Sequence, residues 1–400
     1  MKAIILGICI KNSGEKYKFI FSTGVCSSLY NSSGQELTRW EEVNDNGLLA
    51  GRLVFDSVKG ERYTLEKKIY VTTSRDEQDT KDEQASLDVI VTREIDKLNK
   101  LRYRELYGSH AAAWKNFFGN IDIDIHGDEV ADLSLRFSNY HTAISIPRHD
   151  SIHSIAAKGL TGETYNNFVW WDCEVYQLPV FLHTNPDSAK NAILYRYRML
   201  DSARNNARQE GMKGARFPFT SSVMGNETVW KYARHPFLQI HIVADVAWAV
   251  INYYICTGDT QFLLDYGLEI LWEVSRYWAG RVEYNQKEDR YEIKNVTGTD
   301  EHHPYVDNNA YTNYLVCLVL KYAVVMYEKF RDESGGVVKK IGLEPSEIDE
   351  WKKIAQKIYL PMEKDTGLIP QFDGYFDLSR ELEVSGSGTG KSFQMKESGL

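Results

Sequence analysis

Residues 238–256, LQIHIVADVAWAVINYYIC, form the stretch that decides the fold class. Apolar side chains occur on nearly every side of a helix drawn through it, so we expect a deeply buried helix that ends before Gly258. Successive helices with no intervening strands predict a helical barrel or solenoid rather than a doubly wound sheet. The further helices are expected at about residues 129–145, 185–211, 261–282, 308–333 and 346–359.

Two of these helices begin at recognisable signals. Asn185 suits the N-cap, and Pro186 suits the first helical position, where its missing N–H costs nothing. Ser346 with Asp349 matches a capping box for the helix at 346–359. An apolar stripe follows Asn185 along its helix, at Ala189, Ile193, Tyr197 and Leu200.

Changes in sequence character set the expected domain boundaries. Residues 1–75 contain short runs of strand-forming residues between Gly, Asn and Asp turns, which predicts a β-rich domain. Residues 76–127 are charged and helix-periodic, so we expect one or two linker helices there. Residues 128–400 then form the helical domain.

The bulk composition disfavours several classes of protein. Of the 400 residues, 43% are hydrophobic, and the net charge of −9 argues against binding to nucleic acid or to an anionic membrane surface. No apolar run approaches the length of about 18 residues that a membrane span needs. The apolar segment at 3–10 is interpreted as a strand rather than a signal sequence. Widely spaced cysteines without a C-x-x-C motif indicate a reducing compartment, so a cytoplasmic location is expected.

The sequence FVWWDCEVY, residues 168–176, is the first candidate for a binding site. Aromatic residues make up 12% of the chain, and a flat ring can cover the apolar C–H face of a sugar. Trp171 can stack on a hexose in this way while Asp172 accepts hydrogen bonds from its hydroxyls. The alternative is a buried pair of Trp170 and Trp171, followed by an Asp172 that caps the next helix.

The second candidate is TGTDEHHPYVDNN, residues 297–309, where Glu301 is a possible acid. Glycosidic cleavage needs a carboxylic acid with a raised pKa, and a neighbour such as Asp300 or partial burial can raise it. The alternative is a loop in which Asp307 and Asn308 cap the following helix. A metal site built from Glu301 and the two histidines after it is disfavoured, because adjacent side chains rarely converge on one ion.

The sequence SGSGTGKS, residues 385–392, resembles a phosphate-binding loop. The motif requires Gly where Ser385 stands, and a helix directly after Lys391, which the following residues do not predict. We therefore expect a flexible polar loop.

Four long segments of the chain occur in the same order in glycoside hydrolase family sixty-five, which the chain resembles from about residue 55 onward. They are AAKGLTGETYNNFVWWDCEVYQLPVFLHTNP (156–186), LYRYRMLDSARNNARQEGMKGARFPF (194–219), QIHIVADVAWAVINYY (239–254) and TGTDEHHPYVDNNAYTN (297–313). The family contains maltose, trehalose, kojibiose, nigerose and glucosylglycerol phosphorylases, and some trehalose hydrolases. The resemblance therefore concerns enzymes that act on α-glucosides.

The resemblance implies a mainly α architecture. Part of an N-terminal β-sandwich is expected over residues 1–75, a helical linker over 76–127, and an (α/α)6-barrel catalytic domain over 128–400. The sequence ends before the Lys-Gln segment and the phosphate loop of the family, so a C-terminally truncated barrel is expected. A homodimer is expected for the full-length form.

The resemblance also implies roles for individual residues. Glu301 matches the general acid of the family, and Trp171 with Asp172 matches its glucose-holding pair. Glu227 and His241 lie in segments that border the sugar site. The implied enzyme is an inverting phosphorylase that uses no cofactor. In it, inorganic phosphate attacks an α-glucosyl disaccharide or glucosyl-polyol opposite Glu301 and yields β-glucose 1-phosphate.

Departures from the family pattern leave the acceptor sugar open. Trp170 and Cys173 replace the usual Phe and Thr, Asn167 with Phe168 replaces a typical Gly-His, and residues 302–304 differ from the commoner Tyr-His-Glu. Among enzymes, the alternative is a trehalose-type hydrolase of the same family. Outside enzymes, the alternative is an inactive, truncated carbohydrate-binding remnant.

Overall fold

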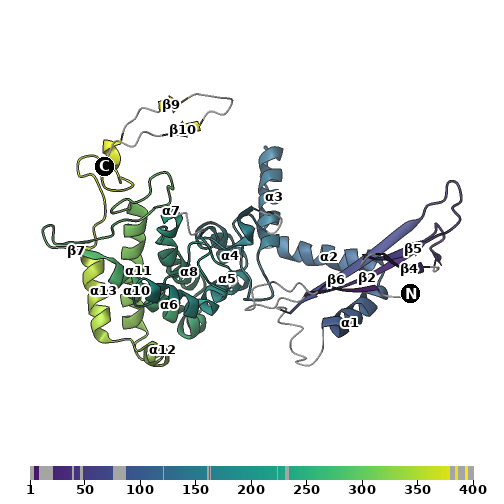
Figure 1. Ribbon diagram of the computed structural model, residues 1–400, viewed down its shortest axis with the longest axis horizontal. Helices are drawn as coiled ribbons and strands as arrows, with labels where there is room; N and C mark the ends of the chain where they lie inside the picture. The colour runs from purple at the N-terminus through teal and green to yellow at the C-terminus, as the bar shows by residue number, and fades with distance from the viewer. Residues whose placement is uncertain are drawn as a thin grey trace. The chain divides into compact units, whose positions relative to one another are not determined.

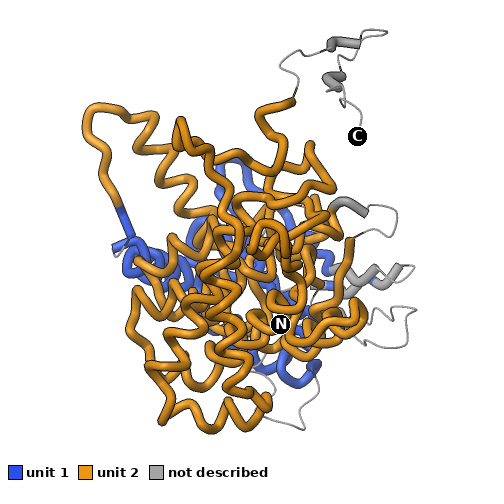
Figure 2. Tube along the Cα trace, turned by 90° about the vertical axis from the view of Figure 1, so that its left-hand side faces the viewer, with its two compact units in different colours: residues 1–122 blue, residues 123–400 orange. Residues whose placement is uncertain are grey.

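The chain divides into two compact units, residues 1–122 and residues 123–400, which Figure 2 colours separately. The structure is a computed structural model, and it shows strands gathered in the first unit and helices dominating the second (Figure 1). The described residues are 4–8, 21–37, 40–45, 48–74, 87–119, 121–159, 162, 164–222, 224–229, 234–378, 383–385 and 392–394.

An antiparallel sheet forms the first unit, with β2 (Phe21–Tyr30) at its centre. This strand pairs with β1 (Ile4–Ile8), β3 (Glu36–Leu37) and β6 (Thr64–Thr73). A separate hairpin joins β4 (Trp40–Asp45) to β5 (Leu48–Leu53). Strands in the first part of the chain are therefore confirmed among the described residues.

Two helices follow the sheet, α1 (Leu87–Asn99) and α2 (Tyr103–Phe118). The first packs on β2 and β6, where Val91 and Ile95 are buried against Cys26. Gly24 of β2 makes this contact possible, because a Cβ there would lie 2.4 Å from Ile95 and 2.5 Å from Val91. The absence of a side chain at one position thus sets how closely the helix approaches the sheet.

The second unit is a succession of helices packed around α8. As the sequence predicts, α8 (His241–Thr257) is deeply buried, and it ends at Gly258, whose φ of 66° is left-handed. It packs against α4, α5, α10 and α11. The helices besides α8 are α3 (Glu129–Ser145), α4 (Leu178–Thr184), α5 (Pro186–Arg198), α6 (Leu200–Gln209), α7 (Arg234–Phe237), α9 (Thr260–Phe262), α10 (Leu268–Arg281), α11 (Ala310–Lys329), α12 (Gly335–Ile341) and α13 (Pro345–Lys357).

Of the two N-terminal capping predictions, one is confirmed and the other is wrong. Asn185 caps α5 as predicted, since its side chain accepts a hydrogen bond of 3.2 Å from the Ser188 N–H. The capping box at residues 346 and 349 is wrong. Glu344 and Glu347 form the box instead, because a glutamate also reaches the free N–H groups of the first turn and can accept from them.

A strand pair also interrupts the helices, contrary to the expectation of helices alone. β7 (Glu283–Asn285) and β8 (Arg290–Glu292) form an antiparallel hairpin between α10 and α11. The Asn285 side chain accepts hydrogen bonds from the N–H groups of Lys287 and Glu288 and so folds the turn locally. Such local bonding is hard to infer from hydrophobic periodicity.

The helix α11 is long and apolar enough to cross a membrane by length and composition. Of its apolar window, 61% is buried inside the unit. Trp272 of α10 donates a hydrogen bond of 3.2 Å to the Ala323 carbonyl on one side, and α13 packs on it as well. In the described part of the chain, α11 therefore has the surroundings of a core helix.

Candidate active site

Trp171 and Asp172 stand directly before η2 (Cys173–Gln177), a π-helical turn that leads into α4. Asp172 is half-buried and makes no side-chain capping hydrogen bond, so the capping interpretation fails. The ring of Trp170 turns elsewhere and packs at 5.1 Å from the ring of Phe219. The two adjacent tryptophans thus have different neighbours, and Asp172 does not cap the following helix.

Glu174, the other acidic residue of this segment, is buried in the core and paired with an arginine. Its carboxylate forms a buried, two-pronged pair with Arg196, at 2.6 and 2.9 Å. Burial raises the pKa of Glu174, and the charge of the guanidinium opposes that shift. Glu174 therefore anchors the turn and is closed to a ligand.

Aromatic rings surround Trp171 on several sides. The ring centroid of His241 lies 4.8 Å away at 79°, that of Tyr176 lies 5.2 Å away, and that of Tyr311 lies 5.9 Å away. His241 is completely buried, and its Nδ1 lies 2.8 Å from the carboxylate of Asp245. The structure thus brings together Trp171 and His241, which the resemblance assigns to one site.

Glu301 lies exposed in the loop before α11. Backbone hydrogen bonds of 2.9 and 2.8 Å between Val296 and Val306 close the base of this loop. The Thr297 N–H donates to the Leu238 carbonyl at 3.1 Å, and this carbonyl belongs to the segment that leads into α8. The loop that carries Glu301 is therefore fastened to the start of the helix that carries His241.

The charge of Glu301 reaches Asp172. Burial raises the pKa of Asp172, the positive charge of Lys158 lowers it, and the negative charge of Glu301 raises it further. A Coulomb interaction weakens with distance, so its presence places the two carboxyl groups in the same part of the second unit. The charges of residues 172 and 301 therefore act on each other although the two residues are far apart in sequence.

The carboxylate of Asp300 interacts with the two histidines of its own turn. Its carboxylate lies 2.9 Å from Nδ1 of His303 and accepts a bond of 3.0 Å from the His302 N–H. Burial opposes ionisation, but these two interactions outweigh it and lower the pKa of Asp300. An ionised Asp300 therefore stabilises the turn next to Glu301.

The alternative in which Asp307 and Asn308 cap the next helix is wrong. Asn309 is the N-cap of α11, and its side chain accepts from the Thr312 N–H at 3.0 Å. Asp307 accepts instead from the Asn295 N–H at 2.8 Å, and Asn308 donates to Asp373 at 2.7 Å. Both residues shape the loop rather than the helix end.

Glu227 uses both carboxylate oxygens inside the 216–229 loop. One oxygen accepts from the N–H of Thr220 and of Thr228, each at 3.1 Å, while the other accepts from the Phe219 N–H at 2.8 Å and from Arg216 at 3.1 Å. These bonds fix Phe219, whose ring also contacts His241. Glu227 remains a predicted sugar contact, and its described partners are all in its own loop.

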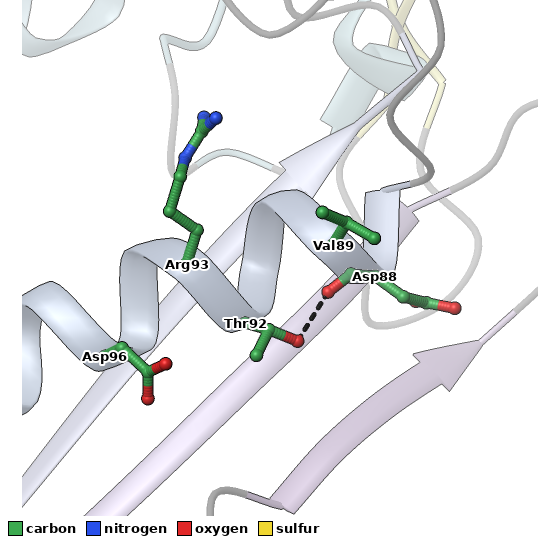
Figure 3. Close-up of a pocket in the computed structure, with 5 residues that line it drawn as sticks. All are labelled: Asp88, Val89, Thr92, Arg93 and Asp96. Carbon is green, nitrogen blue, oxygen red and sulfur yellow. Dashed lines mark hydrogen bonds between the residues drawn. The ribbon is translucent and has the colours of Figure 1, made fainter.

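The other candidate sites give less evidence of a binding function. Most of the phosphate-loop-like segment at 385–392 lies outside the described residues. Within the described ranges, no group of three or more His, Cys, Asp or Glu side chains is placed to hold a metal ion. A depression of 490 Å³ on α1 is lined by Asp88, Val89, Thr92, Arg93 and Asp96. Figure 3 shows these side chains fanning out along one helix, without the stacking ring that a sugar site needs.

Asp245 and Tyr311 belong to the surroundings of Trp171 and were not singled out from the sequence. The signal for the first was available, because Asp245 is an acidic residue one helical turn after His241 in an otherwise apolar helix. Tyr311 gave no such signal. Its position near the start of α11 becomes meaningful only when α11 is placed beside α8.

Comparisons with known proteins identify the family of the chain. The family model described as the glycosyl hydrolase family 65 central catalytic domain matches residues 136–393. A 3-O-α-D-glucosyl-L-rhamnose phosphorylase from Lachnoclostridium phytofermentans is 48% identical over 97% of this chain and 49% of its own length. A kojibiose phosphorylase from Halothermothrix orenii is 41% identical over 82% of this chain and 44% of its own length.

A solved structure of a human-microbiome protein, provisionally assigned as a kojibiose phosphorylase, matches with a TM-score of 0.81 at 22% identity. The match covers 94% of this chain and 49% of that one, and it shows the fold. The chain spans about half the length of the curated relatives it matches. Since the family model covers more than half of the sequence, this chain belongs to glycoside hydrolase family 65.

Proposed function

We propose that this protein is an inverting phosphorylase that cleaves an α-glucoside with inorganic phosphate and releases β-glucose 1-phosphate. The observation that carries the proposal is that the loop of Glu301 is hydrogen-bonded to the segment leading into α8, whose His241 packs against Trp171, the residue before Asp172. A stacking ring, a carboxylate for the hydroxyls and an exposed acid suit a glucosyl residue and its leaving oxygen. Relatives named as phosphorylases of several α-glucosides support the same reaction.

In the proposed reaction, Glu301 donates a proton to the leaving oxygen while phosphate attacks the anomeric carbon from the opposite face. The bond from that carbon to the leaving oxygen breaks as the bond to a phosphate oxygen forms, which inverts the anomeric centre. One protein carboxylate suffices, because the phosphate supplies the nucleophile that an inverting hydrolase must generate from water with a second carboxylate.

We propose 3-O-α-glucosyl-L-rhamnose as the first substrate to test. The relative with that activity in its name is 48% identical and aligns with 97% of this chain. Kojibiose phosphorylases among the relatives align at 39% to 43% identity, a glucosylglycerol phosphorylase at 34%, and trehalose phosphorylases at 34% and 38%. A substrate panel therefore includes these four α-glucosides and maltose.

The test is phosphate dependence. The protein in its longest form is incubated with each α-glucoside, with and without inorganic phosphate, and β-glucose 1-phosphate and free glucose are quantified. We expect β-glucose 1-phosphate in the presence of phosphate and little free glucose in its absence. Free glucose without phosphate would establish the hydrolase alternative. Product from a longer form but none from the 400-residue form would mean that this chain alone is inactive.

A further inference from the structure

A buried carboxylate joins two of the side chains that contact Trp171. Asp245 is completely buried in α8, and one of its oxygens lies 2.8 Å from Nδ1 of His241. The other accepts a hydrogen bond of 2.6 Å from the hydroxyl of Tyr311, which belongs to α11. Asp245 thus connects two helices through one carboxylate.

Both partners of Asp245 touch the ring of Trp171. The centroid distances are 4.8 Å to His241 and 5.9 Å to Tyr311, and the interplanar angles are 79° and 68°. The rings of His241 and Tyr311 also contact each other at 5.6 Å and 89°. Three mutually edge-on rings fix one another's orientation, and the carboxylate fixes two of the three.

We propose that Asp245 is a positioning residue that holds His241 and Tyr311 in place against Trp171. It thereby sets the orientation of the Trp171 ring, which stacks on the glucosyl residue. The inference rests on the proposed function, because it assigns Asp245 a role in the binding of that substrate. Asp245 itself does not touch the substrate.

The bonding of Asp245 is suited to this role. Burial and the negative charge of Asp245 both raise the pKa of Tyr311, so its hydroxyl stays a hydrogen-bond donor. Among the described residues, His241 is the basic side chain in contact with Asp245, and the neighbouring acid Glu174 is paired with Arg196. The carboxylate is therefore directed at His241 and Tyr311.

The placement of a histidine here also needs an explanation. His241 is fully buried, and within the described structure its Nε2 has no hydrogen-bond partner. An apolar ring of similar size would avoid the desolvation of that nitrogen. A histidine instead gives Asp245 a donor that fixes the rotation of the ring, which an apolar ring would lack.

The test is a double-mutant cycle between residues 245 and 171, in the longest form of the protein. Asp245→Asn, Trp171→Ala and the double variant are compared with wild type by their kcat and KM in phosphorolysis. For Asp245→Asn we expect a rise in KM for the α-glucoside of about 10-fold or more, since a displaced ring positions the substrate poorly. The KM for phosphate should stay within about twofold.

The cycle separates positioning from general destabilisation. If Asp245 acts through Trp171, Asp245→Asn will have almost no further effect on kcat/KM when Trp171 is already alanine. Additive effects in the double variant, or a wild-type KM for the α-glucoside in Asp245→Asn, would overturn the inference. If Asp245→Asn fails to fold, Tyr311→Phe replaces it, because that change removes one bond to Asp245 and keeps the ring against Trp171.

A matched control is present in α10. Glu269 is also a buried carboxylate that accepts from a tyrosine hydroxyl, that of Tyr197 at 2.9 Å. Glu269→Gln should reduce stability and leave both KM values unchanged. Wild-type protein that forms no β-glucose 1-phosphate would refute the proposed function, whereas active wild type with an additive cycle would refute the role of Asp245 alone.

Discussion

At the scale of single residues, three carboxylates near Trp171 have different surroundings and therefore different possible tasks. Glu174 is buried and paired with Arg196, Asp172 is half-buried and unengaged in capping, and Glu301 is exposed. A proton donor must be reloaded from solvent after each turnover, which the exposed carboxyl permits. Of these three groups, Glu301 is therefore the one that we propose as the proton donor.

Replacing Glu301 tests that assignment. Glu301→Gln keeps the size of the side chain and removes its titratable proton, so we expect the rate of cleavage to fall by about 10²- to 10⁴-fold. The affinity for glucose, measured by calorimetry, should change little. Glu288→Gln in the β7–β8 turn is the control and should behave as wild type. Full activity in the Glu301 variant would exclude it as the acid.

At the scale of elements, hydrophobic periodicity located helices better than it located their ends. The apolar run at 238–256 predicted α8 to within a few residues, and Asn185 predicted the start of α5. The helix expected over 185–211 is divided at Met199, whose backbone leaves the helical region. That break depends on tertiary packing, which the local sequence does not contain.

Gly24 provides a test of the packing between α1 and β2. Gly24→Ala places a methyl group within 2.5 Å of Val91 and Ile95, so the helix must move away from the sheet. We expect a loss of about 1–3 kcal/mol in the free energy of unfolding of the first unit, measured by urea denaturation. Gly108→Ala in α2 is the control. Among the described residues, apart from its chain neighbours and the nearby backbone of its own helix, no atom lies within 4 Å of the new methyl group, so this change should stabilise slightly.

At the scale of the second unit, charged side chains join helices that are distant in sequence. Glu269 of α10 lies 2.7 Å from Arg204 of α6 and 2.7 Å from Lys340 of α12, and accepts from Tyr197 of α5. The carboxylate is almost completely buried. A buried acid with two cationic partners links four helices through one residue.

This network predicts a dependence of stability on pH. Burial opposes the shift, but Arg204, Lys340 and Tyr197 together lower the pKa of Glu269. A lowered folded-state pKa contributes stability above the ordinary value of about 4.3, and that contribution is lost as the pH falls toward the folded-state value. The urea midpoints of wild type and Glu269→Gln should therefore differ most near pH 6 and converge below about pH 4. A constant difference across this range would contradict the prediction.

The candidate site was only partly predictable from the sequence. The side chains Trp171, Asp172 and Glu301 were identified because their residue types and the segments around them resemble a known family. The electrostatic interaction between Asp172 and Glu301 joins two segments that are distant in sequence, and the bond from Asp245 to Tyr311 depends on how α8 and α11 pack. Interactions across helices leave no periodic trace along the chain, so the structure was needed to find them.

The π-helical turn at Cys173–Gln177 has a further consequence for sequence variation in this protein. A π turn contains one residue more than the α-helical turn it replaces, and each helical residue advances the direction of the side chains by about 100°. Deleting one residue from this turn would leave an ordinary helix leading into α4. Trp171 would then point about a quarter of a turn away from His241. A single codon in this segment thus separates a protein in which Trp171 packs against His241 from one that keeps the same helices and turns the ring away.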